Sequence, residues 1–169
     1  AGSLLLYHRL YVNDGKGNFS LLPDAFPLNN MNIAVAAVND VDNDGDADLF
    51  AGGRSVPQSY GIIPESYLYI NNGKGKFTAG YTAKIGMITD AVFADVNADN
   101  RKELVVVGEW MSPEIFSVRQ NKLEKLKTGL EGMNGWWQTL AVADVDKDGL
   151  NDLVLGNIGE NCYLQPTRT

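Results

Sequence analysis

Short apolar runs and acidic loops alternate along the chain. Residues 33–38 (IAVAAV), 90–96 (DAVFADV) and 139–145 (TLAVADV) each lead into a loop rich in aspartate. A second apolar run follows each loop, and these runs read DLFAGG, ELVVVGEW and DLVLGN. Short runs with many β-branched residues and bounding glycines favour strands over helices. The pattern therefore predicts a unit of strand, acidic loop and strand that occurs three times.

A second repeated segment predicts β-hairpins. LYVNDGKGNF (10–19) returns as LYINNGKGKF (68–77), with seven of ten positions identical. An Asn-Gly turn, which requires positive φ, joins the two strands of such a hairpin. Residues 114–127 (EIFSVRQNKLEKLK) occupy the corresponding place in the next unit, with a turn that is less rich in glycine. Residues 121–132 also fit a short helix, but their place in the repeat predicts a strand.

Together these segments predict an all-β fold, a β-propeller fragment of about three four-stranded antiparallel blades. The first aspartates of the loops, Asp40, Asp95 and Asp144, are 55 and 49 residues apart, as expected for one repeated unit. Residues 1–169 form a single propeller region with a partial blade at 1–30, full blades at 31–86 and 87–131, and a partial blade at 132–169. The last includes the start of a strand at 162–165. Because propellers close with roughly four to eight blades, the chain is either a fragment of a longer propeller or one of two chains that complete a ring, as a homodimer.

The acidic loops share one spacing of oxygen-bearing side chains. Positions 1, 3, 5 and 9 are Asp40, Asp42, Asp44 and Asp48 in the first loop, Asp95, Asn97, Asp99 and Glu103 in the second, and Asp144, Asp146, Asp148 and Asp152 in the third. Position 6 is glycine or asparagine, the residues that best tolerate a sharp turn at positive φ. Calcium takes six to eight oxygen ligands in flexible geometry, which this spacing suits.

Other interpretations of the loops fit less well. An EF-hand needs a glutamate at position 12 and flanking helices, whereas position 12 here is Ala51, Val106 or Leu155. Magnesium prefers strict octahedral geometry, and zinc prefers the Cys or His ligands that the loops lack. Solvated acidic turns without metal remain an alternative. It applies most to the second loop, which has Asn97 in place of an aspartate and contains Arg101 and Lys102.

The acidic loop, the apolar run after it and the LYVNDGKGNF hairpin resemble the FG-GAP/VCBS repeat of integrin-α-type β-propellers, over nearly the whole chain. GEW (108–110) and NGWW (134–137) are similar to the bacterial branch, whose members often carry an additional ASPIC/UnbV-type domain. The resemblance implies calcium in each loop, up to three ions, bound by the side chains above and by the carbonyls of Asp46, Arg101 and Leu150. It also implies a secreted, cell-surface or periplasmic protein.

Composition narrows the function. A net charge of −7 argues against a nucleic-acid partner, and no apolar run reaches the ~20 residues of a membrane helix. The only histidine, His8, has no evident catalytic partner, and Cys162 is expected to be a small buried residue. We therefore expect a non-catalytic module that binds a protein or glycan. The alternative is the propeller portion of a larger polysaccharide-degrading enzyme whose catalytic residues lie outside this chain. Trp110, Trp136 and Trp137 either pack between blades or contact a ligand.

Overall fold

The computed structural model describes residues 7–159, which form twelve strands and, within that range, no helix. The strands are β1 (Leu10–Asn13), β2 (Phe19–Leu22), β3 (Asn32–Asn39), β4 (Asp48–Ser55), β5 (Ser66–Asn71), β6 (Phe77–Ala83), β7 (Met87–Ala94), β8 (Glu103–Met111), β9 (Glu114–Arg119), β10 (Lys122–Lys125), β11 (Gly135–Ala143) and β12 (Asp152–Asn157). The predicted all-β class is confirmed. No helix in residues 7–159 is long and apolar enough to cross a membrane. Cys162 and the strand predicted at 162–165 lie outside the described residues.

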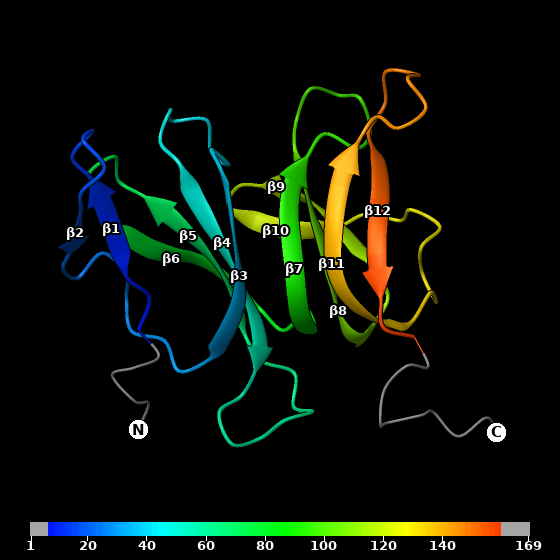
Figure 1. The fold of residues 1–169 in the computed structure, drawn as a ribbon, viewed down its shortest axis with the longest axis horizontal. Coiled ribbons are helices and arrows are strands. Elements are labelled where there is room, and N and C mark those ends of the chain that lie inside the picture. Colours follow the sequence, from blue (N-terminus) through cyan, green and yellow to red (C-terminus); the bar gives the residue numbers. More distant parts are fainter. Residues whose placement is uncertain (1–6, 160–169) are drawn as a thin grey trace.

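The strands assemble as a β-propeller fragment of four-stranded antiparallel blades (Figure 1). Blade one is the sheet β3-β4-β5-β6, and blade two consists of β7, β8, β9 and β10. The pairs β1-β2 and β11-β12 are partial blades on either side. Strands β3 and β11 both lie beside β7, so the first strand of each unit faces the centre of the assembly. Over residues 7–159 the arrangement does not close into a ring.

The segment with an ambiguous sequence pattern is a strand. β10 pairs with β9 in an antiparallel hairpin, with Lys122 opposite Arg119. The turn consists of Gln120 and Asn121, whose φ values are 49° and 59°. Left-handed conformation at both central residues matches the right-handed twist of a hairpin. The strand prediction is therefore confirmed, and the helical alternative for residues 121–132 is wrong.

The two repeated hairpins have five-residue loops rather than two-residue turns. Asn72 N–H donates to the Lys76 carbonyl, and the Asn72 side chain accepts the N–H groups of Lys74 and Lys76. Asp14 plays the same part in the first hairpin. Gly73 has φ of 71°, as the Asn-Gly motif predicts. The asparagine or aspartate therefore closes the loop through its side chain, while the glycine supplies the left-handed turn.

The core lies between blades one and two. Strand β8 is buried along its whole length except at Trp110, which explains why its apolar run is continuous rather than alternating. The buried core cluster comprises Ala37, Phe50, Leu68, Ile88, Ala91, Phe93, Leu104, Val106, Met111 and Phe116. Strand β12 is the counterpart of β8, yet its Val154 is 53% exposed. The difference arises because β8 lies between two blades, whereas among the described residues only one blade adjoins β12.

Candidate metal sites

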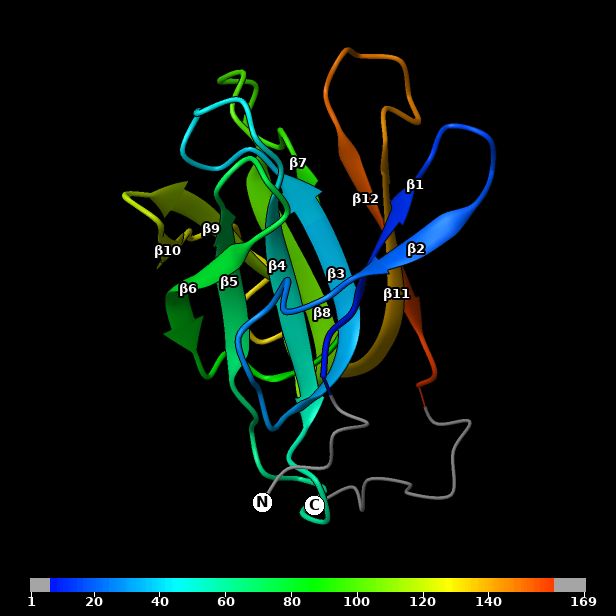
Figure 2. The same cartoon turned by 90° about the vertical axis from the view of Figure 1, so that its left-hand side faces the viewer.

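The three acidic loops lie at the same end of the fragment (Figures 1 and 2). Loop one (residues 40–48) joins β3 to β4, loop two (95–103) joins β7 to β8, and loop three (144–152) joins β11 to β12. Each therefore connects the first and second strands of its unit. The shared position follows directly from the repeat.

One scaffold of hydrogen bonds shapes all three loops. The N–H at position 6 donates to the carboxylate at position 1, with Gly45 to Asp40 at 3.0 Å, Asn100 to Asp95 at 2.8 Å and Gly149 to Asp144 at 3.0 Å. The N–H at position 2 donates to the carboxylate at position 9, with Val41 to Asp48 at 2.9 Å, Val96 to Glu103 at 3.1 Å and Val145 to Asp152 at 2.9 Å. The acids thus first organise the loop backbone. A carboxylate oxygen has two lone pairs, so an oxygen that accepts one N–H can still contact another partner.

The backbone is left-handed at two places in each loop. At position 6, Gly45, Asn100 and Gly149 have φ of 93°, 63° and 90°. At position 4, Asn43, Ala98 and Lys147 have φ of 62°, 60° and 67°. Only the first of these turns is predicted by the sequence, because the residues at position 4 have no chemical feature in common. Positive φ is uncommon outside glycine, so its recurrence at position 4 indicates a backbone held by the surrounding hydrogen bonds.

Carboxylates converge in loops one and three. The oxygens of positions 1, 3 and 9 lie within 4.8 Å of one another in two groups, Asp40, Asp42 and Asp48 in loop one and Asp144, Asp146 and Asp152 in loop three. A third group of this kind is not found in residues 7–159. The carboxylates of Asp44 and Asp148 are outside the groups and accept the N–H at position 7, at 2.9 Å and 2.8 Å. The carbonyl ligands predicted at Asp46, Arg101 and Leu150 stay predictions.

Two observations indicate that the residues around loop one compensate its carboxylates only in part. Asp40 Oδ1 is buried and has no hydrogen-bond partner, an arrangement that is costly without a compensating group. The pKa of Asp42 is raised by desolvation and by the neighbouring charges of Asp48, Asp44 and Asp40. Both observations fit a loop that could hold a cation.

Asp48 is the structural anchor of loop one. Its carboxylate is fully buried, with 0% exposure. One oxygen accepts the N–H of Val41, and the other accepts the N–H of Asn71 at the end of β5, each at 2.9 Å. The residue at position 9 therefore ties the loop to the third strand of the blade as well as to its own backbone.

In loop two, an amide side chain instead of a carboxylate faces the acid at position 9. Asn97 at position 3 donates its Nδ2 to Glu103 Oε1 at 3.1 Å, while its Oδ1 accepts the N–H of Asp99 at 2.9 Å. The backbone bond fixes the orientation of the amide, so an N–H group points toward the acid at position 9. Burial raises the pKa of Glu103, opposed by the Val96 N–H and reinforced by the charges of Asp99 and Asp95.

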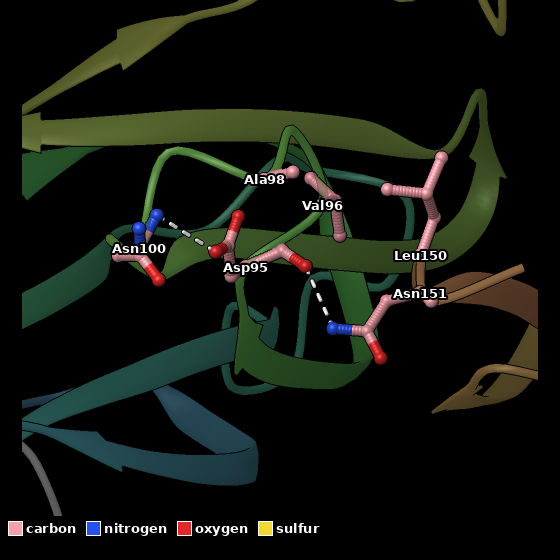
Figure 3. A pocket seen from close by; sticks show the side chains of 7 residues that line it. Asp95, Val96, Ala98, Asn100, Leu150 and Asn151 are labelled. Carbon is pink, nitrogen blue, oxygen red and sulfur yellow. Dashed lines mark hydrogen bonds between the residues drawn. The ribbon is translucent and has the colours of Figure 1, made fainter.

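Shallow hollows separate adjacent loops. The hollow between loops two and three has a volume of about 180 Å³, and Asn151 closes one side of it by donating to the Asp95 carbonyl at 2.7 Å (Figure 3). The hollow between loops one and two is lined by Asp40, Arg101 and Lys102. The basic residues of loop two therefore line the same hollow as the first acid of loop one.

The other predicted residues lie away from the loops. His8 is partly buried, contacts Phe26 and Tyr69 edge to face, and has its pKa lowered by desolvation. Trp136 and Trp137 are partly buried, whereas Trp110 is 52% exposed.

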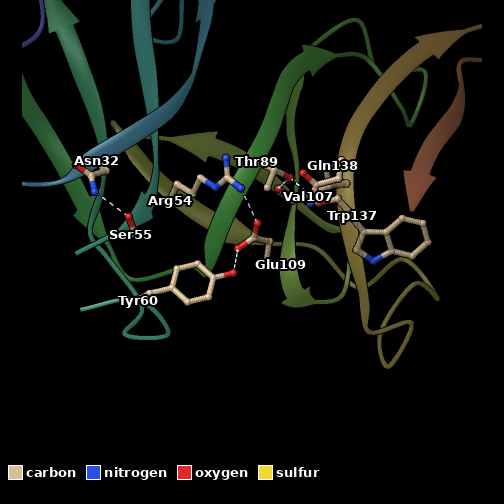
Figure 4. A network of polar contacts seen from close by, with 9 residues as sticks. All are labelled: Asn32, Arg54, Ser55, Tyr60, Thr89, Val107, Glu109, Trp137 and Gln138. Carbon is tan, nitrogen blue, oxygen red and sulfur yellow. Dashed lines mark hydrogen bonds and ion pairs between the residues drawn. The ribbon is translucent and has the colours of Figure 1, made fainter. Parts of the chain in front are cut away.

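Sequence reasoning missed a polar cluster at the opposite end of the strands. The Glu109 carboxylate accepts hydrogen bonds from Arg54 Nη2 at 2.8 Å and from Tyr60 Oη at 2.6 Å (Figure 4). Burial disfavours its charge, but the hydrogen bonds from Tyr60 and Arg54 hold the pKa of Glu109 below its ordinary value. Burial and the bond to Glu109 raise the pKa of Tyr60 to about 12. In the sequence, the GEW motif (108–110), which contains Glu109, was the one feature that could have indicated this cluster.

A comparison with known families matches part of the chain. Residues 95–155 match a family described as an FG-GAP-like repeat. The matched segment begins at the first acid of loop two and ends within β12, so it includes two acidic loops. No curated protein matches the chain. The match supports the FG-GAP repeat family for this segment.

Proposed function

We propose that the chain is a non-catalytic, calcium-binding β-propeller module of a secreted or cell-surface protein, and that it binds a protein or glycan partner. The observation that carries the metal assignment is the convergence of three carboxylates within 4.8 Å in loops one and three. Three like charges this close repel strongly unless a cation lies among them.

The donor chemistry favours calcium over other ions. The side chains at the ligand positions of loops one and three are all aspartates, whose oxygens suit a hard cation and disfavour zinc. Calcium also tolerates the irregular geometry of a flexible loop, whereas magnesium demands a near-octahedral shell. Extracellular modules bind calcium with Kd values of roughly 10⁻⁴–10⁻³ M, which is consistent with the proposed location.

Loops one and three are the proposed sites. In loop one, Asp40, Asp42 and Asp48 would hold the ion, and the unpartnered Oδ1 of Asp40 is an available ligand atom. In loop two, the amide of Asn97 occupies the side of Glu103 that a cation would need. We therefore infer two calcium ions per chain, with loop two closed by an internal hydrogen bond.

The proposed role of the ions is structural. Asp48 joins loop one to β5, so an ion at this loop would fix the first three strands of blade one relative to one another. A catalytic role for the metal would require an open coordination position beside an acid or base. His8, the only histidine of the chain, packs against aromatic rings instead.

A second copy of the chain is the proposed partner for ring closure. Apolar residues are exposed on both partial blades, including Leu21 at 52% and Val154 at 53%. Two copies would supply about six blades, within the range in which propellers close. Light scattering at micromolar concentration tests this directly: a dimer is expected, and a strict monomer would refute it.

Calorimetric titration with Ca²⁺ tests the metal proposal, together with thermal melting in EDTA and in excess Ca²⁺. Heat of binding and a higher Tm with calcium are expected. Titration with Mg²⁺ at the same ionic strength is the control, because simple screening of the acidic loops would affect both ions equally. No binding heat and no change in Tm would refute the proposal.

A further inference from the structure

An exposed aromatic cluster lies at the end of the blades opposite the acidic loops. Trp110 and Tyr60 are 52% and 55% exposed, and their ring centroids are 5.5 Å apart at an angle of 68°. The Trp136 ring also adjoins Trp110, with a centroid distance of 5.9 Å and an interplanar angle of 54°. The residues come from β8, from the segment after β4 and from β11. We call these three side chains the aromatic platform.

The backbone turns Trp110 outward at a local cost. Its φ is 58°, in the left-handed region that bulky residues rarely adopt. The pairing of β11 with β8 shifts register between Met111 and Glu109, so a bulge lies at Trp110. Glu109 and Met111 on either side are buried at 2% and 8% exposure. Bulges of this kind redirect a side chain, and strained residues concentrate where a ligand is bound.

A compensated ion pair lies beside the platform. The Glu109 side chain is 1% exposed and bonds to Arg54, whose side chain is 47% exposed (Figure 4). The Tyr60 hydroxyl donates a hydrogen bond to the same carboxylate. This bond fixes the position of the Tyr60 ring. The pair carries no net charge, yet it presents a half-exposed guanidinium with hydrogen-bond donors beside the rings.

We propose that the aromatic platform binds a neutral pyranose ring of a glycan. A pyranose offers an apolar C–H face that stacks on an indole ring and hydroxyl groups that need donors and acceptors at the edge. About half of the surface of Trp110 and of Tyr60 is open to solvent, and Arg54 lies beside them through its bond to Glu109. A charged ligand would require an uncompensated charge, which the pair of Arg54 and Glu109 does not provide. This inference rests on the proposed binding function and specifies its ligand class.

The test is a glycan array that holds neutral β-glucan, xylan and mannan oligosaccharides beside polygalacturonate oligosaccharides. The wild type is compared with Trp110→Ala, Tyr60→Ala and the control Phe19→Ala, which removes a 65% exposed aromatic ring from another blade. Retention on a neutral glycan is expected, with a loss of roughly tenfold or more in either platform variant and none in the control, as for a central hot spot. Titration of the retained oligosaccharide against tryptophan fluorescence gives the Kd values.

Several results would overturn the proposal: no retention of any neutral glycan, retention of polygalacturonate alone, or unchanged binding in both platform variants. Capture of a protein that is lost in Trp110→Ala without glycan retention would assign the surface to a protein instead. Calcium titration of the same samples keeps the two proposals separate. Two bound ions without glycan binding would refute the platform alone, and absence of calcium binding would refute the metal sites alone. Circular dichroism shows whether each variant is folded, independently of calcium binding.

Discussion

Replacing Asp48 with asparagine removes the buried carboxylate that joins loop one to β5. The wild-type carboxylate accepts two backbone N–H groups, from Val41 and Asn71, each at 2.9 Å. Hydrogen bonds to a charged group contribute about 1.5–3 kcal/mol each. The amide of asparagine can accept one of the two bonds, and its own NH₂ group then faces the other donor. In EDTA, the free energy of unfolding of the variant should therefore be about 3 kcal/mol lower than that of the wild type. This corresponds to a Tm roughly 6–12 °C lower for a chain of this size.

Calcium should enlarge the difference. An ion at a free concentration of about 100 Kd stabilises the folded state by about 2.7 kcal/mol per site. Wild-type protein gains this at loops one and three, whereas Asp48→Asn gains it only at loop three, so the rise in Tm on adding calcium should fall to about half.

Differential scanning calorimetry in EDTA and in saturating Ca²⁺ measures both quantities. Asp46→Asn is the matched control, because it removes the same charge from the same loop and leaves the backbone carbonyl at position 7 in place. Equal Tm changes for the two variants in both buffers would show that Asp48 acts only through net charge and would refute the anchoring role.

Three further predictions follow from the loops and the polar cluster. Asn97→Asp should complete a third group of acids and raise the calcium stoichiometry from two to three, while Asn97→Ala keeps two; calorimetric titration that still gives two for the aspartate variant would contradict the role of the amide. Ionised Glu109 has a pKa below its ordinary value of 4.5, so its stabilisation is present above pH 4.5 and is lost as the pH falls through the lower folded-state value. In EDTA, urea unfolding should show that the difference in free energy of unfolding between wild type and Glu109→Gln shrinks from neutral pH to about pH 3. A difference that stays constant would contradict the ion pair. Gly149→Ala should cost about 1 kcal/mol through backbone strain alone, because φ is +90° and no atom lies within 4 Å of the added Cβ; urea unfolding in calcium measures it, and no loss would contradict the left-handed turn.

Much of the fold follows from the sequence because the chain repeats its units. The strand pairs around each loop, the repeated hairpins and the strand at Lys122–Lys125 are all set by local patterns that recur at corresponding places. A repeat gives several independent examples of one structure, so the reading of an ambiguous segment is corrected by its better-defined counterparts. The number of residues in the hairpin loops is less predictable, since it depends on the side chain of Asp14 or Asn72 accepting backbone N–H groups.

The site could be predicted only where its chemistry is local. Aspartates at alternate positions of one loop indicate a cation from their spacing alone, and their convergence in loops one and three agrees with it. The function of Asn97 depends on which way its amide turns, and that is decided by the N–H of Asp99 in the folded loop. Glu109 is 55 residues from Arg54 and 49 from Tyr60 in the sequence, and it meets them only where blades one and two adjoin.

The most direct test of the metal assignment is a count of calcium ions bound per chain, by native mass spectrometry of protein dialysed against Ca²⁺. Two ions are predicted for the wild type, one lost in Asp42→Asn and the other in Asp146→Asn, since these residues hold position 3 of loops one and three. Wild-type protein without bound calcium, or a count that neither substitution changes, would contradict it.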